Sequence, residues 1–402
     1  MFDRLSTLQI YQSGISTILD KQADLARTQL ELSSGKRIQS PSDDPSGAVK
    51  ILDLEEDIRL VDQYQRNASL AQGQLAVEES TLSGVNNVLQ RVRELTVQAN
   101  NATQSPETRA SIAVEVNARL EELVALANTR DANDEYLFAG FQAQTQPFTQ
   151  QGGAVTYSGD DGQRFLDIAA SAQIAVRDSG SRVFLAVDAG NGSFDFSAAS
   201  ANTGTAVVSA SSADNSFVRD DYTVTFSQLS PTDPVTYSVT DSSAAVVAAG
   251  NYTPGEAISF NGARLVVDGT PEDGDSITLE SAPKQSIFET LRGIADALEN
   301  SSGSPSGGAA VNNALASGLN NLDQAIGNVL EVQSDVGVRL NRIDSQQSIN
   351  EEFNLQLQTT LSDVQDVDFA ETISKLNLQL VALQAAQQTY VTTQGLTLFN
   401  YI

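Results

Sequence analysis

Residues 8–32 read LQIYQSGISTILDKQADLARTQLEL, and the spacing of their apolar side chains decides the fold. Steps of three and four residues connect Leu8, Tyr11, Ile15, Ile18, Gln22, Leu25, Gln29 and Leu32. Alternating steps of three and four are typical of the buried seam of a left-handed coiled coil. The sequence therefore predicts a long N-terminal helix that packs along a second helix.

The C-terminal end of the chain carries the same spacing. Its row consists of Phe369, Ile373, Leu376, Leu380, Leu383, Gln387, Tyr390 and Gln394. We expect the two ends to pair as long antiparallel coiled-coil helices, and the apolar members of both rows to carry subunit assembly. The glutamines lower the stability of an isolated pair and can fix its register, so we predict helices that order fully on assembly. An ordinary core within one chain is the alternative.

Further helices are expected between these ends. Pro45 is placed to begin a long helix that runs to a break near residues 100–101, and Ser105, followed by proline, is an N-cap. Ser286 opens a capping box at the start of another helix. Residues 301–308 read as a flexible linker, after which a long helix leads toward the C-terminal segment.

The middle of the chain has a different amino-acid composition. From about 140 to 282, Gly, Ser, Thr, Asp and β-branched residues dominate, in alternating runs such as 222–226 and 235–239. Turn signals at 158–162, 188–192 and 272–275 separate these runs, as in an antiparallel β domain. The predicted fold class is therefore α+β, with terminal helices that enclose a central antiparallel β-rich domain.

Composition narrows the classes of function. The 402 residues exceed what one compact core usually supports, and the formal charge of −28 argues against nucleic acid as a partner. The chain has no cysteine, histidine or tryptophan, which removes thiol nucleophiles, imidazole bases and most transition-metal ligand sets. We find neither a signal peptide nor a membrane-spanning run, and we predict no enzyme activity, no cofactor, no metal and no membrane insertion.

Three segments resemble the flagellin superfamily. The stretch LSSGKRIQSPSDDP at 32–45 is similar to the spoke loop between the first two helices of those proteins, with Ser40, Pro41, Asp43, Asp44 and Pro45 in its motif. Residues 89–98 resemble a second helical segment, and 366–371 resemble the start of the last helix. Residues 136–141, 157–163 and 396–402 are similar to the hook-associated branch of the superfamily.

The resemblance implies a structural subunit of the extracellular bacterial flagellum, at the junction between hook and filament. The implied partners are other copies of the chain, hook-associated protein 1, flagellin and an export chaperone on the C-terminal helix. Residues 1–35 and 366–402 would form an inner tube, 36–140 and 283–365 a helical shell, and 141–282 an outward-facing β-rich domain. The absence of a signal peptide agrees with export through the flagellar type III apparatus.

Two other functions stay open at this point: a flagellin that forms the filament itself, and a secreted adhesin that presents the central β domain.

Some single motifs allow both a functional and a purely structural interpretation. The carboxylates at 43–44, 160–161 and 273–275 are candidate cation ligands, but helix capping and turn chemistry explain them. The cluster of Arg91, Arg93 and Glu94 resembles a flagellin surface that an immune receptor recognises, and a solvated helix surface is the simpler interpretation.

Overall fold

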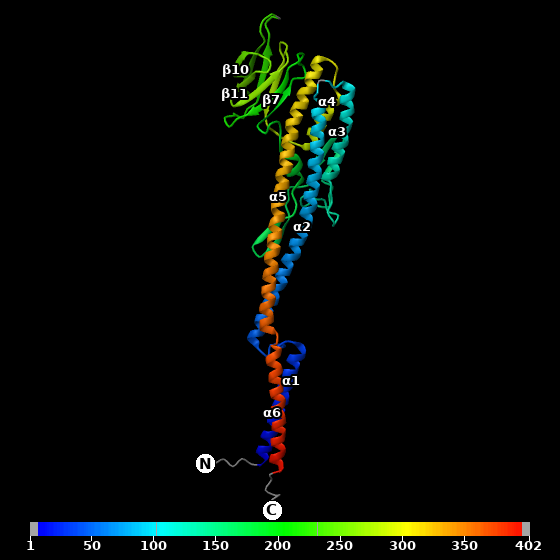
Figure 1. Ribbon diagram of the computed structural model, residues 1–402. Coiled ribbons are helices and arrows are strands. Elements are labelled where there is room, and N and C mark those ends of the chain that lie inside the picture. Colours follow the sequence, from blue (N-terminus) through cyan, green and yellow to red (C-terminus); the bar gives the residue numbers. More distant parts are fainter. Residues whose placement is uncertain (1–6, 102, 231, 396–402) are drawn as a thin grey trace, which may run out of the picture. The chain divides into compact units, whose positions relative to one another are not determined.

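A computed structural model of the chain describes residues 7–101, 103–230 and 232–395. It divides into two compact units, one of residues 1–66 with 347–402 and one of residues 67–346. The helices are α1 (Thr7–Ser34), α2 (Pro45–Ala99), α3 (Pro106–Ala127), α4 (Ile287–Glu299), α5 (Pro305–Gln365) and α6 (Phe369–Gly395) (Figure 1). Both α2 and α5 continue from one unit into the other.

The predicted helix starts are confirmed at three places. Helix α2 begins at Pro45, the Ser105 side chain accepts from the backbone N–H of Thr108, and the Ser286 side chain accepts from that of Phe288. The prediction of a linker as far as residue 308 was wrong in its second half, because α5 already begins at Pro305. Ser304 Oγ accepts from the backbone N–H of Gly307 at 3.1 Å, so this serine caps the new helix.

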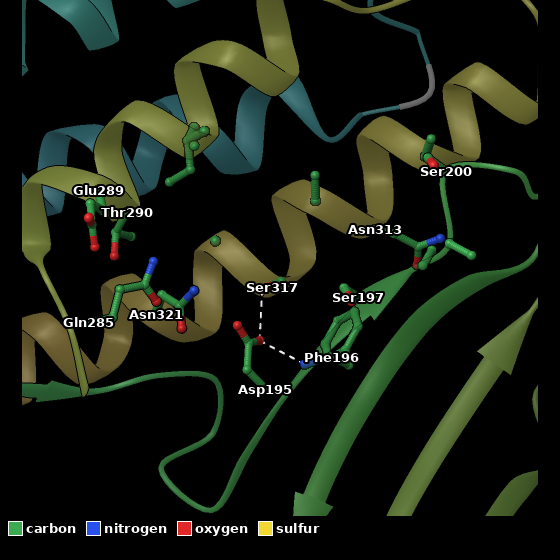
Figure 2. A pocket seen from close by; sticks show the side chains of 17 residues that line it. Asp195, Phe196, Ser197, Ser200, Gln285, Glu289, Thr290, Asn313, Ser317 and Asn321 are labelled. Atoms are coloured by element: carbon green, nitrogen blue, oxygen red, sulfur yellow. Dashed lines mark hydrogen bonds between the residues drawn. The ribbon is translucent and has the colours of Figure 1, made fainter. Parts of the chain in front are cut away.

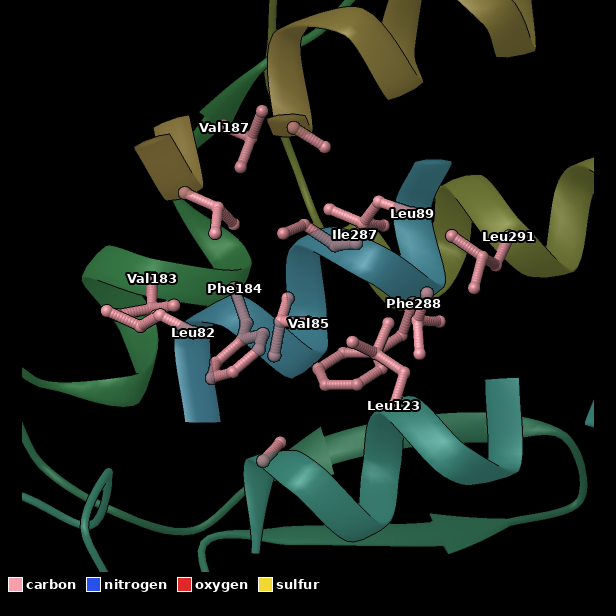
Figure 3. Packing of buried hydrophobic residues seen from close by; sticks show 14 of the residues in the cluster. Leu82, Val85, Leu89, Leu123, Val183, Phe184, Val187, Ile287, Phe288 and Leu291 are labelled. Carbon is pink, nitrogen blue, oxygen red and sulfur yellow. The ribbon is translucent and has the colours of Figure 1, made fainter. Parts of the chain in front are cut away.

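A helical core occupies most of the unit 67–346. Buried side chains of α2, α3, α4 and α5 meet there with residues from the loops and short hairpins between 137 and 187. Figure 3 shows Leu82, Val85 and Leu89 of α2 around the rings of Phe184 and Phe288. The centroids of these two rings lie 5.5 Å apart. The start of the central region is thus part of the helical core.

The rest of the central region has a core of its own. Its five-stranded sheet has the order β10-β9-β8-β13-β6 and its three-stranded sheet the order β11-β12-β7. The strands are β6 (Phe194–Ala198), β7 (Val207–Ala213), β8 (Tyr222–Ser227), β9 (Thr236–Thr240), β10 (Val246–Asn251), β11 (Ala257–Phe260), β12 (Ala263–Asp268) and β13 (Ser276–Ser281). Both sheets contribute side chains to one apolar cluster, and their pairings are antiparallel as predicted.

Two short hairpins precede this region, and two short strands from its two ends pair with each other. They are β1 (Phe148–Gln151) with β2 (Ala154–Tyr157), β3 (Phe165–Ala169) with β4 (Ala172–Ala175), and β5 (Val187–Asp188) with β14 (Lys284–Gln285). A single turn of π-helix, Ser181–Leu185, carries Phe184 into the helical core. Sequence patterns did not predict this turn.

Asparagines on α5 fasten the central region to the helices. Asn313 Oδ1 accepts from the backbone N–H of Val208 at 2.8 Å, while its Nδ2 donates to the carbonyl of Ala206 at 2.8 Å. Two turns further along α5, Asn321 accepts from the backbone N–H of Gly190. These amides satisfy backbone groups that no neighbouring strand reaches, including the edge of β7.

A buried cluster of charges fixes the segment that follows β4. Arg177 Nη2 donates to Asp131 Oδ2 at 2.7 Å and to Glu135 Oε2 at 2.6 Å. Asp178 accepts from Arg182 at 2.8 Å and from Arg339 of α5 at 2.5 Å. Each buried charge therefore has an opposite charge in hydrogen-bond contact, the condition under which burial is tolerated.

Glu78 of α2 is the exception in this cluster. Its side chain is fully buried, and Oε1 accepts from the backbone N–H of Asp178 at 3.1 Å while Oε2 has no partner among the described residues. Burial, reinforced by the nearby Asp178 carboxylate, raises the pKa of Glu78 to about 8. At neutral pH the group therefore retains its proton.

We expect Glu78→Gln to remove a pH dependence of stability. The folded-state pKa of Glu78 exceeds its ordinary value of 4.5, so its contribution is complete below that value and is lost as pH rises toward about 8. The free energy of unfolding of the wild type should fall relative to that of the variant by at most about 1.4 kcal/mol per pH unit. Urea titrations between pH 5 and 9 measure this difference.

The matched control is Glu121→Gln, a carboxyl on the exposed face of α3. It should keep the slope of the wild type. Parallel curves for wild type and Glu78→Gln over the whole pH range would show that Glu78 is ionised in the folded protein.

Candidate assembly surface

Helices α1 and α6 lie side by side and run in opposite directions (Figure 1). Near one end of the pair, a Cβ placed on Gly35 would lie 3.8 Å from the ring of Phe369. Near the other end, the rings of Tyr11 and Tyr390 meet edge to face with centroids 6.3 Å apart. The predicted pairing of the two ends of the chain is confirmed.

The side chains between the two helices follow a heptad pattern. On α1 the less exposed row is Tyr11, Gly14, Ile18, Lys21, Leu25, Thr28 and Leu32. On α6 it is Thr372, Leu376, Gln379, Leu383, Ala386, Tyr390 and Thr393. Apolar residues thus alternate with small or polar ones along this seam, and knobs-into-holes packing explains the spacing.

The predicted register of the seam was wrong in every second position. Ile15, Gln22 and Gln29 point outward, and their places are taken by Gly14, Lys21 and Thr28. Close approach is the physical reason, because a Cβ on Gly14 would already lie 2.8 Å from the Tyr390 ring. The larger isoleucine does not fit at this position. The side chain of Leu8 lies outside the described part of the structure.

The same shift applies to α6. Ile373, Leu380, Gln387 and Gln394 were expected inside the seam, but they are exposed, and so is Phe369 at the start of the helix. The glutamines that were expected inside the seam are therefore surface residues. Ile15 is 46% exposed, Ile373 46% and Leu380 38%, so a large apolar area of each helix faces solvent in a single chain.

Three of the exposed apolar side chains lie on one side of the pair. Ile15, Ile373 and Leu380 each follow a seam residue directly, at Gly14, Thr372 and Gln379. In an antiparallel pair, residues that follow the seam in this way lie on the same side, and we call this side the apolar flank. It also holds the exposed side chains of Gln22, Gln29, Gln387 and Gln394. The opposite side, the polar flank, holds the residues that directly precede seam positions: Thr17, Asp24, Glu31, Lys375, Ala382 and Thr389. Leu19, Leu30, Leu378, Val381 and Val391 are exposed elsewhere on the two helices.

The loop between α1 and α2 connects the N-terminal half of this unit to the C-terminal half. Gly35 ends α1 with a positive φ of 73°, a conformation that glycine adopts without strain. Its carbonyl accepts from the backbone N–H of Val367 at 3.0 Å, and the backbone N–H of Arg37 donates to the carbonyl of Gln365 at 2.7 Å. The loop and the α5–α6 connection thus hold each other in place.

The two adjacent carboxylates of the loop are engaged in capping. Asp43 accepts from the backbone N–H of Ser40 at 2.9 Å, and this bond is the main reason that the pKa of Asp43 lies below its usual value. Asp44 accepts from the backbone N–H of Gly47 at 3.0 Å, in the first turn of α2, which lowers its pKa in the same way. Ser40 also bonds the side chain of Asp43, and Pro45 is the first helical residue. Pro41 lies in the turn between them.

The other candidate motifs are also occupied by contacts within the chain. Asp160 accepts from the backbone N–H groups of Phe141 and Gly162, each at 2.8 Å. Arg91 donates to Glu115 at 2.9 Å, and Arg93 donates to Asp323 at 2.6 Å. Among the described residues, no cluster of acidic side chains has the geometry to hold a metal ion, and no helix is long and apolar enough to cross a membrane.

Comparison with known families agrees with this architecture. The model of the bacterial flagellin N-terminal helical region matches residues 5–143, and that of the C-terminal helical region matches residues 319–402. The chain is 26% identical over 397 residues to flagellar hook-associated protein 3 of Escherichia coli (strain K12), covering 99% of each chain. Similarity to phase 1 flagellin of Salmonella naestved, at 38% identity, covers 28% of this chain.

Solved structures extend the comparison. The crystal structure of flagellar hook-associated protein 3 from Legionella pneumophila is 35% identical, with a TM-score of 0.74, over 77% of this chain and 98% of that chain. The crystal structure of FlgL from Xanthomonas campestris is 32% identical, with a TM-score of 0.72, over 77% of this chain and 99% of that chain.

The paired terminal helices and the two flagellin regions define a structural protein of the flagellin superfamily. Within the superfamily, the chain belongs to the flagellar hook-associated protein 3 family.

Gly14→Leu should separate α1 from α6. The new side chain would overlap the Tyr390 ring, whose Cδ2 atom lies 2.8 Å from the position of a Cβ on Gly14. We expect hydrogen exchange of the α1 and α6 amides to accelerate at least about tenfold, because packing supplies most of the stability of such helices. Gly73→Leu is the control, since a Cβ there has no neighbour within 4 Å. Unchanged exchange in Gly14→Leu would contradict the register of this pair.

Proposed function

We propose that this chain is a structural subunit of the bacterial flagellum, forms the junction between hook and filament by self-assembly, and supports filament growth. The apolar flank carries the proposal, because Ile15, Ile373 and Leu380 are exposed in one chain, and contact with another copy would bury them. Similarity over the whole chain to hook-associated protein 3 supports this function over that of a filament subunit, since similarity to flagellin is confined to part of the chain.

Self-assembly through one flank has a geometric consequence. The apolar flank of one pair meets a different surface of its neighbour, so the contact is heterologous and repeats into an open helical array. Burial of apolar area at about 25 cal/mol per Å² then stabilises the terminal helices in the assembly. The predicted assembly residues Tyr11, Ile18, Leu25, Leu32, Leu376, Leu383 and Tyr390 act within each pair, and Ile15, Phe369, Ile373 and Leu380 act between subunits.

The partners follow from this position. Hook-associated protein 1 would lie on one side of the junction and flagellin on the other, with further copies of the chain between them. Before export as an unfolded chain through the type III apparatus, a chaperone would cover the exposed apolar side chains of α6. In the assembled junction, 1–35 and 366–402 form the inner tube, 36–140 and 283–365 the shell, and 141–282 the outer surface. The proposal assigns no catalytic role, and the similar proteins are structural as well.

Leu380→Asp should abolish incorporation into the flagellum. The variant places an unpaired charge in an apolar contact between subunits, at a cost on the order of 3 kcal/mol for each contact. Ala382→Asp is the matched control, because it introduces the same charge two residues away on the polar flank. The measurement is the amount of each variant in purified hook-basal bodies, with circular dichroism to verify folding. Equal incorporation of both variants would exclude the apolar flank as the contact surface.

Loss of the gene tests the junction role directly. Electron micrographs of such cells should show hooks without filaments, and the medium should contain monomeric flagellin. Intact filaments would reject the junction role. Bare hooks without any flagellin in the medium would indicate that the chain is the filament subunit.

If the chain were an adhesin, deletion of the β sandwich, the two packed sheets of residues 194–281, would give a different phenotype. Phe194 and Ser281 are register partners at the ends of β6 and β13, so residues 194–281 can be replaced by a short glycine linker without opening the helical core. We expect this deletion to retain filament attachment and motility. Loss of surface binding with motility intact would favour the adhesin.

A further inference from the structure

A groove of about 320 Å³ lies on the pair of α1 and α6, at the end where Tyr11 meets Tyr390. The rings of these two tyrosines line it together with Gly14, where a Cβ would lie 2.8 Å from the Tyr390 ring. Thr17 and Thr389 of the polar flank also line it, so the groove opens on that flank. Its volume is at the lower end of the range for ligand pockets, which suits a side chain rather than a whole helix.

The described residues that line the groove are all uncharged, and its threonines need no polar partner. The hydroxyl groups of Thr17, Thr389 and Thr393 each donate, at 2.8 Å, to the carbonyl four residues earlier on the same helix. An apolar occupant therefore leaves none of these donors unpaired. The two tyrosine rings add apolar area for contact with it.

A cavity of similar volume in the unit 67–346, between β6, α4 and α5, has a different chemistry. Figure 2 shows Asp195 and Glu289 among the side chains around it, and the Asp195 carboxylate accepts from the hydroxyl of Ser317 at 2.8 Å. An aliphatic occupant would displace water from these carboxylates without replacing its hydrogen bonds, which is unfavourable. Of these two sites, the groove on the helix pair is therefore the one suited to an apolar group.

The chain itself carries side chains that match the groove. Ile15, Ile373 and Leu380 are aliphatic and exposed, and they lie on the apolar flank. Because the groove and the apolar flank are on opposite sides of the same pair, a chain cannot place its own flank in its own groove. Successive copies can do so, since each offers a groove on one side and apolar side chains on the other, and such a heterologous contact repeats from copy to copy.

Charge favours contact between copies at this place. Each chain has a formal charge of −28, so copies repel one another overall, and a stable contact is favoured where the touching surfaces are uncharged and apolar. The charged residues of the polar flank, Asp24, Glu31 and Lys375, lie outside the groove. The groove is therefore a part of the polar flank that a second copy can approach without meeting a charge.

We propose that the groove receives an aliphatic side chain from the apolar flank of a second copy, with the two tyrosine rings packing against it. The proposal rests on the proposed self-assembly and names the surface that receives the apolar flank. Ile15 follows Gly14 directly and so lies at the height of the groove, whereas Leu380 and Ile373 lie about one and two heptads further along the pair. A heptad spans about 10 Å, so the side chain that enters the groove measures the shift between neighbours along the helices.

Cysteine cross-linking tests the contact, and the chain has no cysteine of its own to interfere. Thr389→Cys is combined in one chain with Ile15→Cys, Leu380→Cys or Ile373→Cys, and purified hook-basal bodies are oxidised. We expect one of the three combinations to give disulfide-linked multimers, because only residues in contact reach disulfide distance. In the control for that combination, Ala382→Cys replaces Thr389→Cys. It lies on the polar flank one heptad from the groove and should give at least about tenfold fewer multimers.

Reactivity toward N-ethylmaleimide separates a second copy from a segment of the same chain as the occupant. Thr389→Cys should react in the free chain at a rate similar to that of Ala382→Cys, and at least about tenfold more slowly in hook-basal bodies. Slow reaction already in the free chain would show that the same chain fills its own groove, and would overturn the proposal.

Filling the groove is a test that needs no cross-link. Thr17→Trp places a large ring in the groove, and it should lower incorporation into hook-basal bodies at least about tenfold relative to Asp24→Trp. Asp24→Trp is the matched control, because it adds the same ring one heptad away on the same flank. Circular dichroism verifies that both variants fold.

The outcomes separate this proposal from the proposed function. Absence of multimers in all three combinations, in preparations that contain the variants, overturns the groove as the contact, and so does equal incorporation of Thr17→Trp and Asp24→Trp. Neither result contradicts the junction role, because the chain is then present in the structure. A wild-type chain that is missing from hook-basal bodies would contradict the proposed function, and this proposal with it.

Discussion

Two helices that pack along a single seam bury only one row of side chains on each helix. In the terminal pair, the other apolar side chains therefore stay exposed. In α1 and α6 the buried rows include Gly14, Thr28, Thr372 and Ala386. The small residues allow the helices to approach closely. Ile15, Ile373 and Leu380 do not lie in this close contact and stay exposed. Apolar side chains that a pair cannot bury need a further surface, so a single chain is an incomplete structure.

In the unit 67–346, directional polar contacts attach the two β sheets to the long helices. Asn313 and Asn321 bond to backbone groups of the central region that have no strand beside them. The ion pairs of Arg177, Arg182 and Arg339 then fix the segment at 177–182 against the loop after α3 and against α5. Directional polar contacts define where the segment lies, whereas apolar packing alone tolerates small displacements.

Periodicity in the sequence predicted the helices, their pairing and the antiparallel strands, because these features repeat over many residues. It did not predict the register of the seam, since α1 contains two rows with the same spacing and the choice depends on the contact between Gly14 and Tyr390. The loop motif around Asp43 and Asp44 was found by resemblance, and local capping accounts for it. Glu78 and Asn321 carry no local signal, because their roles arise from residues about a hundred positions away.

A seam of alternating apolar and small or polar residues stabilises an isolated pair less than a seam of leucines would. Lys21 and Gln379 keep polar ends near the contact, and the residues with the larger apolar area, such as Ile15 and Leu380, contribute only when a neighbour covers them. The free energy that orders the terminal helices is therefore divided between the chain and the assembly. A pair built in this way is easier to unfold in a single chain than in an assembly that covers its exposed apolar residues.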